Sequence, residues 1–244
     1  KIVHISDIHV GSFISEKPLA NAVKLIGDQK PDIIFFTGDL INNITAETNG
    51  FFHVLKNIQA PLGVLSVLGN HDYGFYNVNY SEKERLKNFE MLKKFQKELG
   101  WKLLLNEHHR IRKGNDEIAV IGVENWSSFL HFPRFGNLER ALEGTDNVPV
   151  KILLTHDPTH WSGEVIGKDH NINLTLSGHT HGMQMGIEVP GFRWSPVQYI
   201  YEHWAGLYSN RNRFLYVNRG LGFIGYMGRL GILPEITVFN IFAE

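Results

Sequence analysis

The sequence of 244 residues contains no cysteine, so it can form neither a disulfide nor a metal site built on thiolates. It has no run of about 18 uninterrupted apolar residues, the length of a membrane span, and no recognisable signal peptide. Neither charge is in excess, because 24 Lys and Arg residues balance 25 Asp and Glu residues. This balance argues against a dedicated nucleic-acid binder, although it does not exclude a local basic patch.

Histidine, in contrast, is abundant, with 13 residues. Hydrophobic residues make up 43% and charged residues 20% of the chain, which is typical of a soluble globular protein. Because we find no linker, repeat or low-complexity segment, we expect residues 1–244 to form a single domain. The chain begins at Lys1 inside an apolar run, so we interpret it as lacking a native N-terminal segment.

Short apolar runs rich in Ile, Val, Leu and Phe predict strands that are buried on both faces. They cover residues 2–6, 32–37, 63–68, 118–123, 150–155 and 172–177, and two further strands are predicted at 214–218 and 235–242. Helices are predicted at residues 18–29, 46–58 and 81–99; the last begins with a capping box of Ser81 and Glu84 and ends at Gly100. The pattern predicts an α/β fold with helices layered around mostly buried sheet.

Polar side chains follow five of these strands where the strands end. They are Asp7 and His9, then Asp39, then Asn70, His71 and Asp72, then His156, and finally His179 and His181. Ligands of open α/β sheets bind beyond the carboxyl ends of the strands, so we expect these side chains to meet in one crevice.

Seven of these side chains offer only nitrogen and oxygen donors: Asp7, His9, Asp39, Asn70, His156, His179 and His181. Seven donors are too many for one tetrahedral ion, but they suit two ions about 3.5–4 Å apart that share a carboxylate. Such donors are compatible with Mn²⁺, Fe²⁺ and Zn²⁺, so they do not identify the metal. A single histidine at a strand end is more often structural, but five such motifs in sequence favour a dinuclear metal site.

The order Asp-x-His, Gly-Asp, Gly-Asn-His-Asp, His, Gly-His-x-His resembles the signature of the calcineurin-like metallophosphoesterase superfamily. The segments "SGHTHGMQ", "AGLY", "YVNRGLG" and "LPEITVF" resemble its YkuE-like bacterial branch. The resemblance implies a four-layer α/β/β/α sandwich. It also implies that one metal is held by Asp7, His9, Asp39 and His181, and the other by Asp39, Asn70, His156 and His179, with Asp39 as the bridge.

The resemblance further implies hydrolysis of a phosphodiester, phosphomonoester or pyrophosphate by a hydroxide bound to two divalent ions. His71 would face the scissile phosphate and donate a proton or hydrogen bond. Asn42 stands where the family often has an acid that orients this histidine, and its side-chain amide could still accept a hydrogen bond from the ring. We expect Asp72 to brace the turn, with a contact to a histidine as the alternative. Arg219 is a candidate phosphate contact, with a structural ion pair as an equally supported interpretation.

Two aromatic or glycine-rich segments, residues 125–135 and 222–234, could line an apolar groove, touch a membrane or cover the core. Relatives in the branch often carry N-terminal membrane helices. We therefore expect membrane association through a missing N-terminal segment, with the catalytic domain on the cytoplasmic side. Without such a segment, we expect the protein to be cytoplasmic. The substrate would be a phosphorylated small molecule or a lipid-linked one.

Two functions are alternatives to this phosphohydrolase. One is a nuclease, which the net charge disfavours, and the other is a non-catalytic metal-binding scaffold. The sequence does not indicate the oligomeric state.

Overall fold

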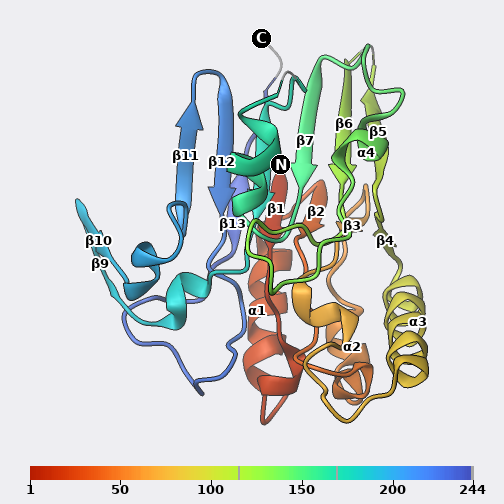
Figure 1. The fold of residues 1–244 in the computed structure, drawn as a ribbon, viewed down its shortest axis with the longest axis vertical. Helices are drawn as coiled ribbons and strands as arrows, with labels where there is room; N and C mark the ends of the chain where they lie inside the picture. The colour runs from red at the N-terminus through yellow and green to blue at the C-terminus, as the bar shows by residue number, and fades with distance from the viewer. Residues whose placement is uncertain (115, 169, 243–244) are drawn as a thin grey trace.

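The computed structural model describes residues 1–114, 116–168 and 170–242, and its main feature is a pair of β-sheets (Figure 1). The strand order is β13-β1-β2-β3-β4 in the first sheet and β11-β12-β8-β7-β6-β5 in the second. Strands β9 (Ile187–Val189) and β10 (Phe192–Trp194) form a separate hairpin.

The first sheet consists of β1 (Ile2–Ile5), β2 (Ile33–Phe36), β3 (Val64–Ser66), β4 (Trp101–Leu103) and β13 (Thr237–Phe239). The second consists of β5 (Glu107–Lys113), β6 (Asp116–Gly122), β7 (Val150–Leu154), β8 (Leu174–Ser177), β11 (Gly206–Asn210) and β12 (Arg213–Val217). Strands β1 to β4 run parallel, as do β6, β7, β8 and β12, whereas β13, β5 and β11 are antiparallel edge strands.

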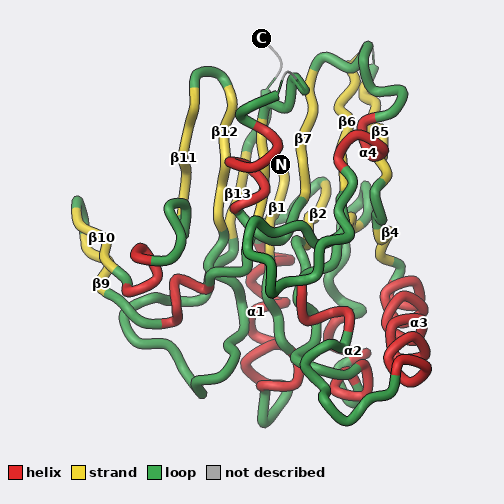
Figure 2. The backbone as a smooth tube through the Cα atoms, in the orientation of Figure 1, coloured by secondary structure: helices red, strands yellow, loops and turns green. Residues whose placement is uncertain are grey.

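The helices complete two outer layers (Figure 2). They are α1 (Lys17–Asp28), α2 (Phe52–Leu55), α3 (Glu82–Leu99) and α4 (Leu138–Leu142), with a π-helical turn at Trp161–Val165. Short 3₁₀ helices lie at Val10–Ser12, Thr45–Thr48, Asn70–Tyr73, His181–Gln184 and Pro196–Tyr199.

Three groups of buried apolar side chains hold these layers together. One lies between the two sheets, where Phe35 and Val67 pack in the same cluster as Val120 and Leu154. A second joins the first sheet to α1, α2 and α3, and a third joins the second sheet to α4 and the π-helical turn. The expected α/β/β/α sandwich is therefore confirmed, and burial on both faces explains why its central strands are nearly all apolar.

The predicted strands all have counterparts in the structure, but the helix expected at residues 46–58 is wrong. That segment divides into the 3₁₀ helix Thr45–Thr48 and the four-residue α2, because Gly50 takes a left-handed conformation with φ of 90° between them. The strand expected at 235–242 is limited to Thr237–Phe239. Strand β5 was not predicted, because as an edge strand it has no buried residue and its sequence is polar.

The topology places the carboxyl ends of the parallel strands at one edge of the sandwich. Strands β1, β2 and β3 end there in the first sheet, and β7 and β8 end there in the second. In Figure 2 loops and helices, α1 and α2 among them, lie below these strand ends. These loops carry the polar residues that the sequence places after each strand.

Candidate metal centre

The turns that follow β1, β2 and β3 are joined directly to one another. Asp7 N donates a 2.9 Å hydrogen bond to Gly38 O, and His9 N donates one of 3.1 Å to Asp39 O. Gly38 has φ of 95°, and a Cβ there would lie 2.3 Å from Gly69 N. The glycine thus permits a close approach of two backbones that brings the turns together.

One group of three possible metal ligands consists of Asp7, His9 and His181, all buried. His181 Nε2 lies 3.2 Å from Asp7 Oδ1 and 3.1 Å from His9 Nε2. The other ring nitrogen of His9, Nδ1, lies 3.2 Å from the carbonyl oxygen of Ile41. A proton on Nδ1 would donate to that carbonyl and leave Nε2 free to bind a cation.

The second group consists of Asp39, His156 and His179. His156 Nε2 lies 3.1 Å from Asp39 Oδ2 and 3.2 Å from His179 Nδ1. His156 Nδ1 lies 2.7 Å from the carbonyl oxygen of Thr37, so this ring is oriented in the same way as that of His9. In each group the candidate donor atoms point toward a common centre.

Asp39 connects the two groups through one oxygen. Its Oδ2 lies 3.1 Å from His156 Nε2 in the second group and 3.5 Å from His9 Nε2 in the first. Its Oδ1 accepts a 2.9 Å hydrogen bond from the backbone N–H of His71. This geometry suits a bridging carboxylate between two ions.

The amide of Asn70 supplies a further donor. Its Oδ1 is buried and has no hydrogen-bond partner among the described residues, whereas its Nδ2 donates a 2.8 Å hydrogen bond to Tyr76 Oη. A buried, unpartnered carbonyl oxygen is costly unless a cation or water satisfies it.

The spacing of the histidine and carboxylate donors also suits metal ions. Tetrahedral ligands about 2.0–2.1 Å from an ion lie about 3.3 Å apart, close to the separations of 3.1–3.2 Å between neighbouring donor atoms within the two groups. The residues therefore fit two metal ions.

The electrostatics of the centre also favour cations. Burial alone would lower the pKa of His156, but the adjacent Asp39 carboxylate outweighs it and raises that pKa to about 10. Histidine neighbours hold the pKa of Asp39 well below its usual range despite its burial. Burial lowers the pKa of His9 to about 3 and that of His179 to about 4. The centre thus holds ionised carboxylates beside two neutral histidines, His9 and His179, whereas His156 carries a proton that a bound cation would have to displace.

The backbone is strained at five of the candidate ligands. Left-handed φ values occur at Asp7 (52°), His9 (48°), Asp39 (59°), His179 (73°) and His181 (51°). Non-glycine residues rarely adopt this region, and such strained conformations cluster at functional sites. Nothing in the sequence pattern distinguishes these positions from unstrained ones.

His71 lies at the rim of the centre, with its ring held on two sides. The ring stacks on Tyr76 at a centroid distance of 4.1 Å and packs edge-on against His9 at 5.0 Å. Its Nδ1 lies 2.6 Å from the backbone carbonyl oxygen of Asn42. With the Nδ1 proton donated to this carbonyl, Nε2 is the nitrogen available to a substrate.

The expectation for Asn42 therefore needs a correction. The ring of His71 is oriented by the main-chain carbonyl of Asn42 and not by its side chain, whose Nδ2 donates to Ser12 Oγ at 2.9 Å. Any residue with this backbone could make the contact with His71, which explains how an amide can occupy the position.

Asp72 binds the backbone of two neighbouring turns. Its Oδ2 accepts hydrogen bonds of 2.9 Å from Gly69 N and Asp39 N, and its Oδ1 accepts from Leu40 N at 2.9 Å and Ile41 N at 3.4 Å. Burial and the charge of Asp39 raise the pKa of Asp72 to about 7. The carboxylate fixes the turn that carries Asp39 relative to the turn that carries Asn70 and His71.

Arg219 is held in two ion pairs, one with Glu235 and one with Glu188. Its backbone N–H also donates to Glu235 at 3.2 Å. These contacts correspond to the structural ion pair rather than to the phosphate contact, because a phosphate would have to displace a carboxylate from the guanidinium.

Four residues near the centre were not identified from the sequence: Tyr76, Phe132, Tyr201 and Arg229. Tyr201 Oη lies 2.7 Å from His179 Nε2, and the Phe132 ring packs edge-on against the same histidine at 4.8 Å. Arg229 donates to the backbone carbonyls of Arg219, Gly220 and Gly222. The aromatic composition of residues 125–135 hinted at Phe132, but no motif marks the tyrosines.

A family model for the calcineurin-like phosphoesterases matches residues 1–183. The chain belongs to this family. Among its calcineurin-like relatives is the uncharacterized metallophosphoesterase YkuE of Bacillus subtilis, which is 30% identical over 244 residues, covering 99% of this chain and 78% of YkuE. This match confirms the resemblance to the YkuE-like branch. The family hydrolyses phosphoesters and depends on metal ions, in agreement with the two ligand groups.

Further calcineurin-like relatives differ in length. Phosphodiesterase YaeI of Escherichia coli is 28% identical, with 99% of this chain and 82% of YaeI covered. A transmembrane protein with metallophosphoesterase domain from Bos taurus is 32% identical over 97% of this chain, which spans only 52% of that protein. The solved structure of sulfate thiohydrolase SoxB from Thermus thermophilus has a TM-score of 0.57 at 14% identity, covers 88% of this chain and 51% of SoxB, and shows a shared fold.

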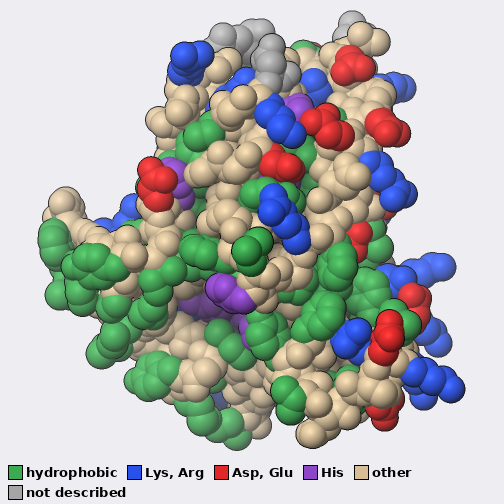
Figure 3. All heavy atoms as spheres, in the orientation of Figure 1, with side chains coloured by type: hydrophobic (Ala, Val, Ile, Leu, Met, Phe, Trp, Pro, Cys, Tyr) green, Lys and Arg blue, Asp and Glu red, His purple; other side chains and the backbone are tan. Residues whose placement is uncertain are grey.

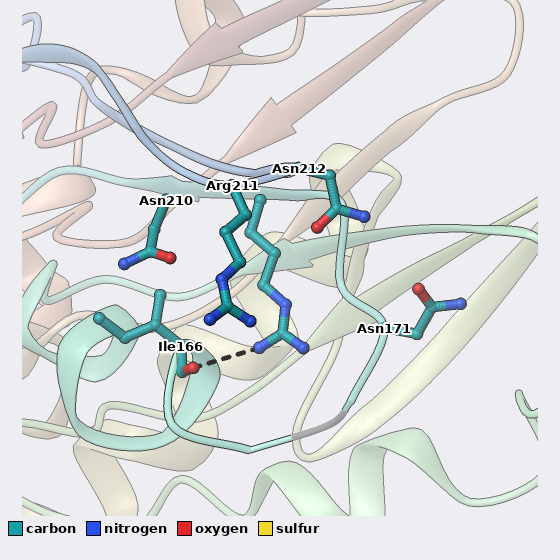
Figure 4. Close-up of a pocket in the computed structure, with 6 residues that line it drawn as sticks. Ile166, Asn171, Asn210, Arg211 and Asn212 are labelled. Carbon is teal, nitrogen blue, oxygen red and sulfur yellow. Dashed lines mark hydrogen bonds between the residues drawn. The ribbon is translucent and has the colours of Figure 1, made fainter.

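A separate polar cavity of about 470 Å³ lies at the turn between β11 and β12. Figure 4 shows it between Asn210, Arg211 and Asn212 on one side and Ile166 and Asn171 on the other. It lies at the amino end of β12, whereas the candidate ligands follow the carboxyl ends of the parallel strands. None of the candidate metal ligands lines it, so we place the chemistry at the metal centre.

Proposed function

We propose that this chain hydrolyses a phosphodiester with the help of two divalent metal ions. The observation that carries the proposal is the single oxygen of Asp39, Oδ2, which lies within 3.5 Å of candidate ligands in both groups. Asp7, His9 and His181 would hold one ion, and Asn70, His156 and His179 would hold the other. Asp39 would contribute to both. The name of the relative YaeI, a phosphodiesterase, supports this bond type.

Divalent ions in such a site polarise phosphoryl oxygens and lower the pKa of an attacking water. The chain supplies the remaining parts of the reaction. Hydrogen bonds between the turns and to Asp72 hold the ligands rigidly. With a proton on each ring nitrogen, His71 donates the one on Nε2 to the leaving oxygen and is left neutral, while the Nδ1 proton stays hydrogen-bonded to the carbonyl of Asn42 and keeps the ring oriented.

The test compares hydrolysis of bis-p-nitrophenyl phosphate and p-nitrophenyl phosphate, each with Mn²⁺, Fe²⁺ or Zn²⁺. We expect faster hydrolysis of the diester, loss of activity with EDTA, and loss of activity in Asp39→Asn. Asp146→Asn is a matched control, because Asp146 is exposed and remote from the ligand groups. Binding of two metals without hydrolysis of any phosphoester would contradict the proposal and favour a scaffold.

We further propose that the substrate carries an apolar group and is met at a membrane surface. No described helix has the combination of length and apolar character that would let it span a bilayer, so the support comes from the surface. In Figure 3 histidine side chains lie in a hollow bordered by hydrophobic side chains. An apolar cavity of about 350 Å³ lies nearby, lined by Phe13, Leu221, Phe223 and Leu233 among others.

The hairpin β9–β10 supports the same proposal. Its charged residues contact the body of the protein, because Glu188 pairs with Arg219, and Arg193 lies 5.0 Å from the Trp204 ring centroid. Ile187, Val189 and Phe192 alternate with these residues and are 51–54% exposed. A hairpin with its charges against the protein and its apolar side chains in solvent suits contact with lipid.

The substrate class is tested with a phosphodiester that carries two acyl chains and with the same headgroup without them. We expect a lower KM for the acylated substrate and co-flotation of the protein with phosphatidylglycerol vesicles. Replacing Ile187, Val189 and Phe192 with serine should abolish flotation, whereas Leu86→Ser, an exposed site on α3, should not. Equal KM values and no flotation would leave a phosphodiesterase that acts on a water-soluble substrate.

A further inference from the structure

Two ligands assigned to the same metal ion are each hydrogen-bonded to a tyrosine hydroxyl. Asn70 Nδ2 donates to Tyr76 Oη at 2.8 Å, and His179 Nε2 lies 2.7 Å from Tyr201 Oη. These tyrosines come from different parts of the chain: Tyr76 follows the turn after β3, and Tyr201 follows the 3₁₀ helix Pro196–Tyr199. Both contacts reach ligands of the group that contains His156.

The roles of donor and acceptor follow from the chemistry of each ligand. His179 Nδ1 faces His156 Nε2 at 3.2 Å, so it is the nitrogen turned toward the second ligand group. A nitrogen that binds a cation carries no proton, so the ring proton lies on Nε2 and is donated to Tyr201. Asn70 binds through Oδ1, and its Nδ2 then requires an acceptor, which Tyr76 provides.

We propose that Tyr76 and Tyr201 are positioning residues that set the affinity of this one metal ion by fixing the orientation of Asn70 and His179. The assignment of the ion rests on the proposed function. An amide can rotate so that its nitrogen faces the ion, and an imidazole can turn its bound nitrogen away. The hydrogen bond from each ligand to a hydroxyl on its outer side must break before the side chain can rotate, and it thereby restrains both ligands. Partners of this kind typically change metal affinity by about 10–100-fold when they are removed.

The first metal ion provides an internal reference. Its histidine ligand His9 is oriented by a backbone carbonyl, Ile41 O, and not by a tyrosine. His181 Nδ1 faces Arg229 at 3.3 Å. The two tyrosines should therefore affect one of the two ions and leave the other unchanged. A general loss of structure would affect both.

Phenylalanine substitutions isolate the hydroxyls. In Tyr76→Phe the ring that stacks on His71 is kept, and in Tyr201→Phe the ring that packs edge-on against Phe129 at 5.2 Å is kept. Tyr199→Phe is the matched control, because Tyr199 is 78% exposed and lies two residues from Tyr201. Tyr76→Leu removes the ring as well and tests whether stacking matters beyond the hydroxyl.

The experiment measures Mn²⁺ binding by calorimetry and by electron paramagnetic resonance of free Mn²⁺, using the full chain. Tyr76→Phe and Tyr201→Phe should each weaken one of two sites by about 10–100-fold and leave the other at its original affinity. Thermal unfolding in EDTA should be unchanged, and phosphodiester hydrolysis should recover at high Mn²⁺. Tyr199→Phe should match the wild type throughout.

Two unchanged Mn²⁺ affinities in both Phe variants would overturn the inference. Equal weakening of both sites, or a lower melting temperature in EDTA, would also overturn it, because the tyrosines would then act on the fold as a whole. A wild-type chain that binds two Mn²⁺ ions but hydrolyses no phosphoester would refute the proposed function only. The affinity measurements on the variants would then still decide the role of the tyrosines.

Discussion

Replacement of Asp72 by asparagine should loosen the connection between two turns of the metal centre. The wild-type carboxylate uses both oxygens, each accepting from two backbone N–H groups. An asparagine keeps one oxygen and places an NH₂ group where the other oxygen was. If the remaining oxygen binds Asp39 N and Gly69 N, then Leu40 N and Ile41 N face a donor instead of an acceptor.

The magnitude follows from these lost acceptors. A buried donor without a partner costs about 1–3 kcal/mol, and of the two affected contacts one is short (2.9 Å) and one is long (3.4 Å). We therefore expect the metal-loaded protein to lose about 2–4 kcal/mol of unfolding free energy. In the metal-free protein the loss should be smaller, because asparagine also removes the repulsion between Asp72 and Asp39 that raises the pKa of Asp72.

Urea unfolding of Asp72→Asn and the wild type, each with saturating Mn²⁺ and with EDTA, measures both effects. The larger loss in the loaded protein is equivalent to a lower metal affinity, because the two states are linked through metal binding. Asp146→Asn should change the unfolding free energy by no more than about 0.5 kcal/mol, as expected of an exposed site. Identical stabilities of Asp72→Asn and the wild type in Mn²⁺ would refute the bracing role.

Three further outcomes are expected. His71→Ala should retain both metal ions by elemental analysis and lose about 10²–10⁴-fold in rate, with a smaller loss for nitrophenolate leaving groups; an unchanged rate with a poor leaving group would exclude the acid role. Gly178→Ala should reduce metal content, because its Cβ would lie 2.0 Å from Ser6 Oγ and 2.1 Å from Asp7 Oδ2; two bound ions would contradict this. Burial lowers the pKa of His4 from 6.5 to about 4, so the unfolded chain binds more protons in that range and stability falls as the pH decreases through it. At pH 5 this difference in proton binding lowers the unfolding free energy by about 2 kcal/mol. The unfolding free energy lost between pH 7.5 and pH 5 should therefore be smaller by this amount in His4→Gln than in the wild type. Equal losses in the two proteins would contradict the assignment to His4.

The layers of the fold and the placement of polar side chains at the strand ends could be predicted because both depend on local sequence features. Strands buried on both faces are nearly all apolar, and a polar residue directly after such a run lies at the end of the strand whatever the rest of the fold does. The edge strand β5 has no such feature. None of its residues is buried and its sequence is mostly polar, so only its pairing with β6 makes it a strand, and its existence depends on a tertiary contact.

The details of the site could not be predicted, because they depend on which atom of a residue faces which neighbour. Asn42 lies beside His71 as expected, yet its backbone makes the contact and its side chain binds Ser12. Arg219 has the chemistry of a phosphate ligand, but two glutamates from other parts of the chain already bind it. Residue type indicates what a side chain can bind, whereas the fold decides what it meets.

The strained backbone of the ligands has a consequence for how the metal centre forms. Five left-handed residues at about 1–3 kcal/mol each would together cost as much as a typical domain's whole stability of about 5–15 kcal/mol. The strain is offset by contacts within the chain, since Asp7, His9 and Asp39 are held by hydrogen bonds between neighbouring turns, and His179 N donates to Asp7 Oδ2 at 3.0 Å. These bonds do not require a metal ion. Formation of the centre therefore depends on the hydrogen bonds that hold these turns together, and weakening them should reduce metal binding.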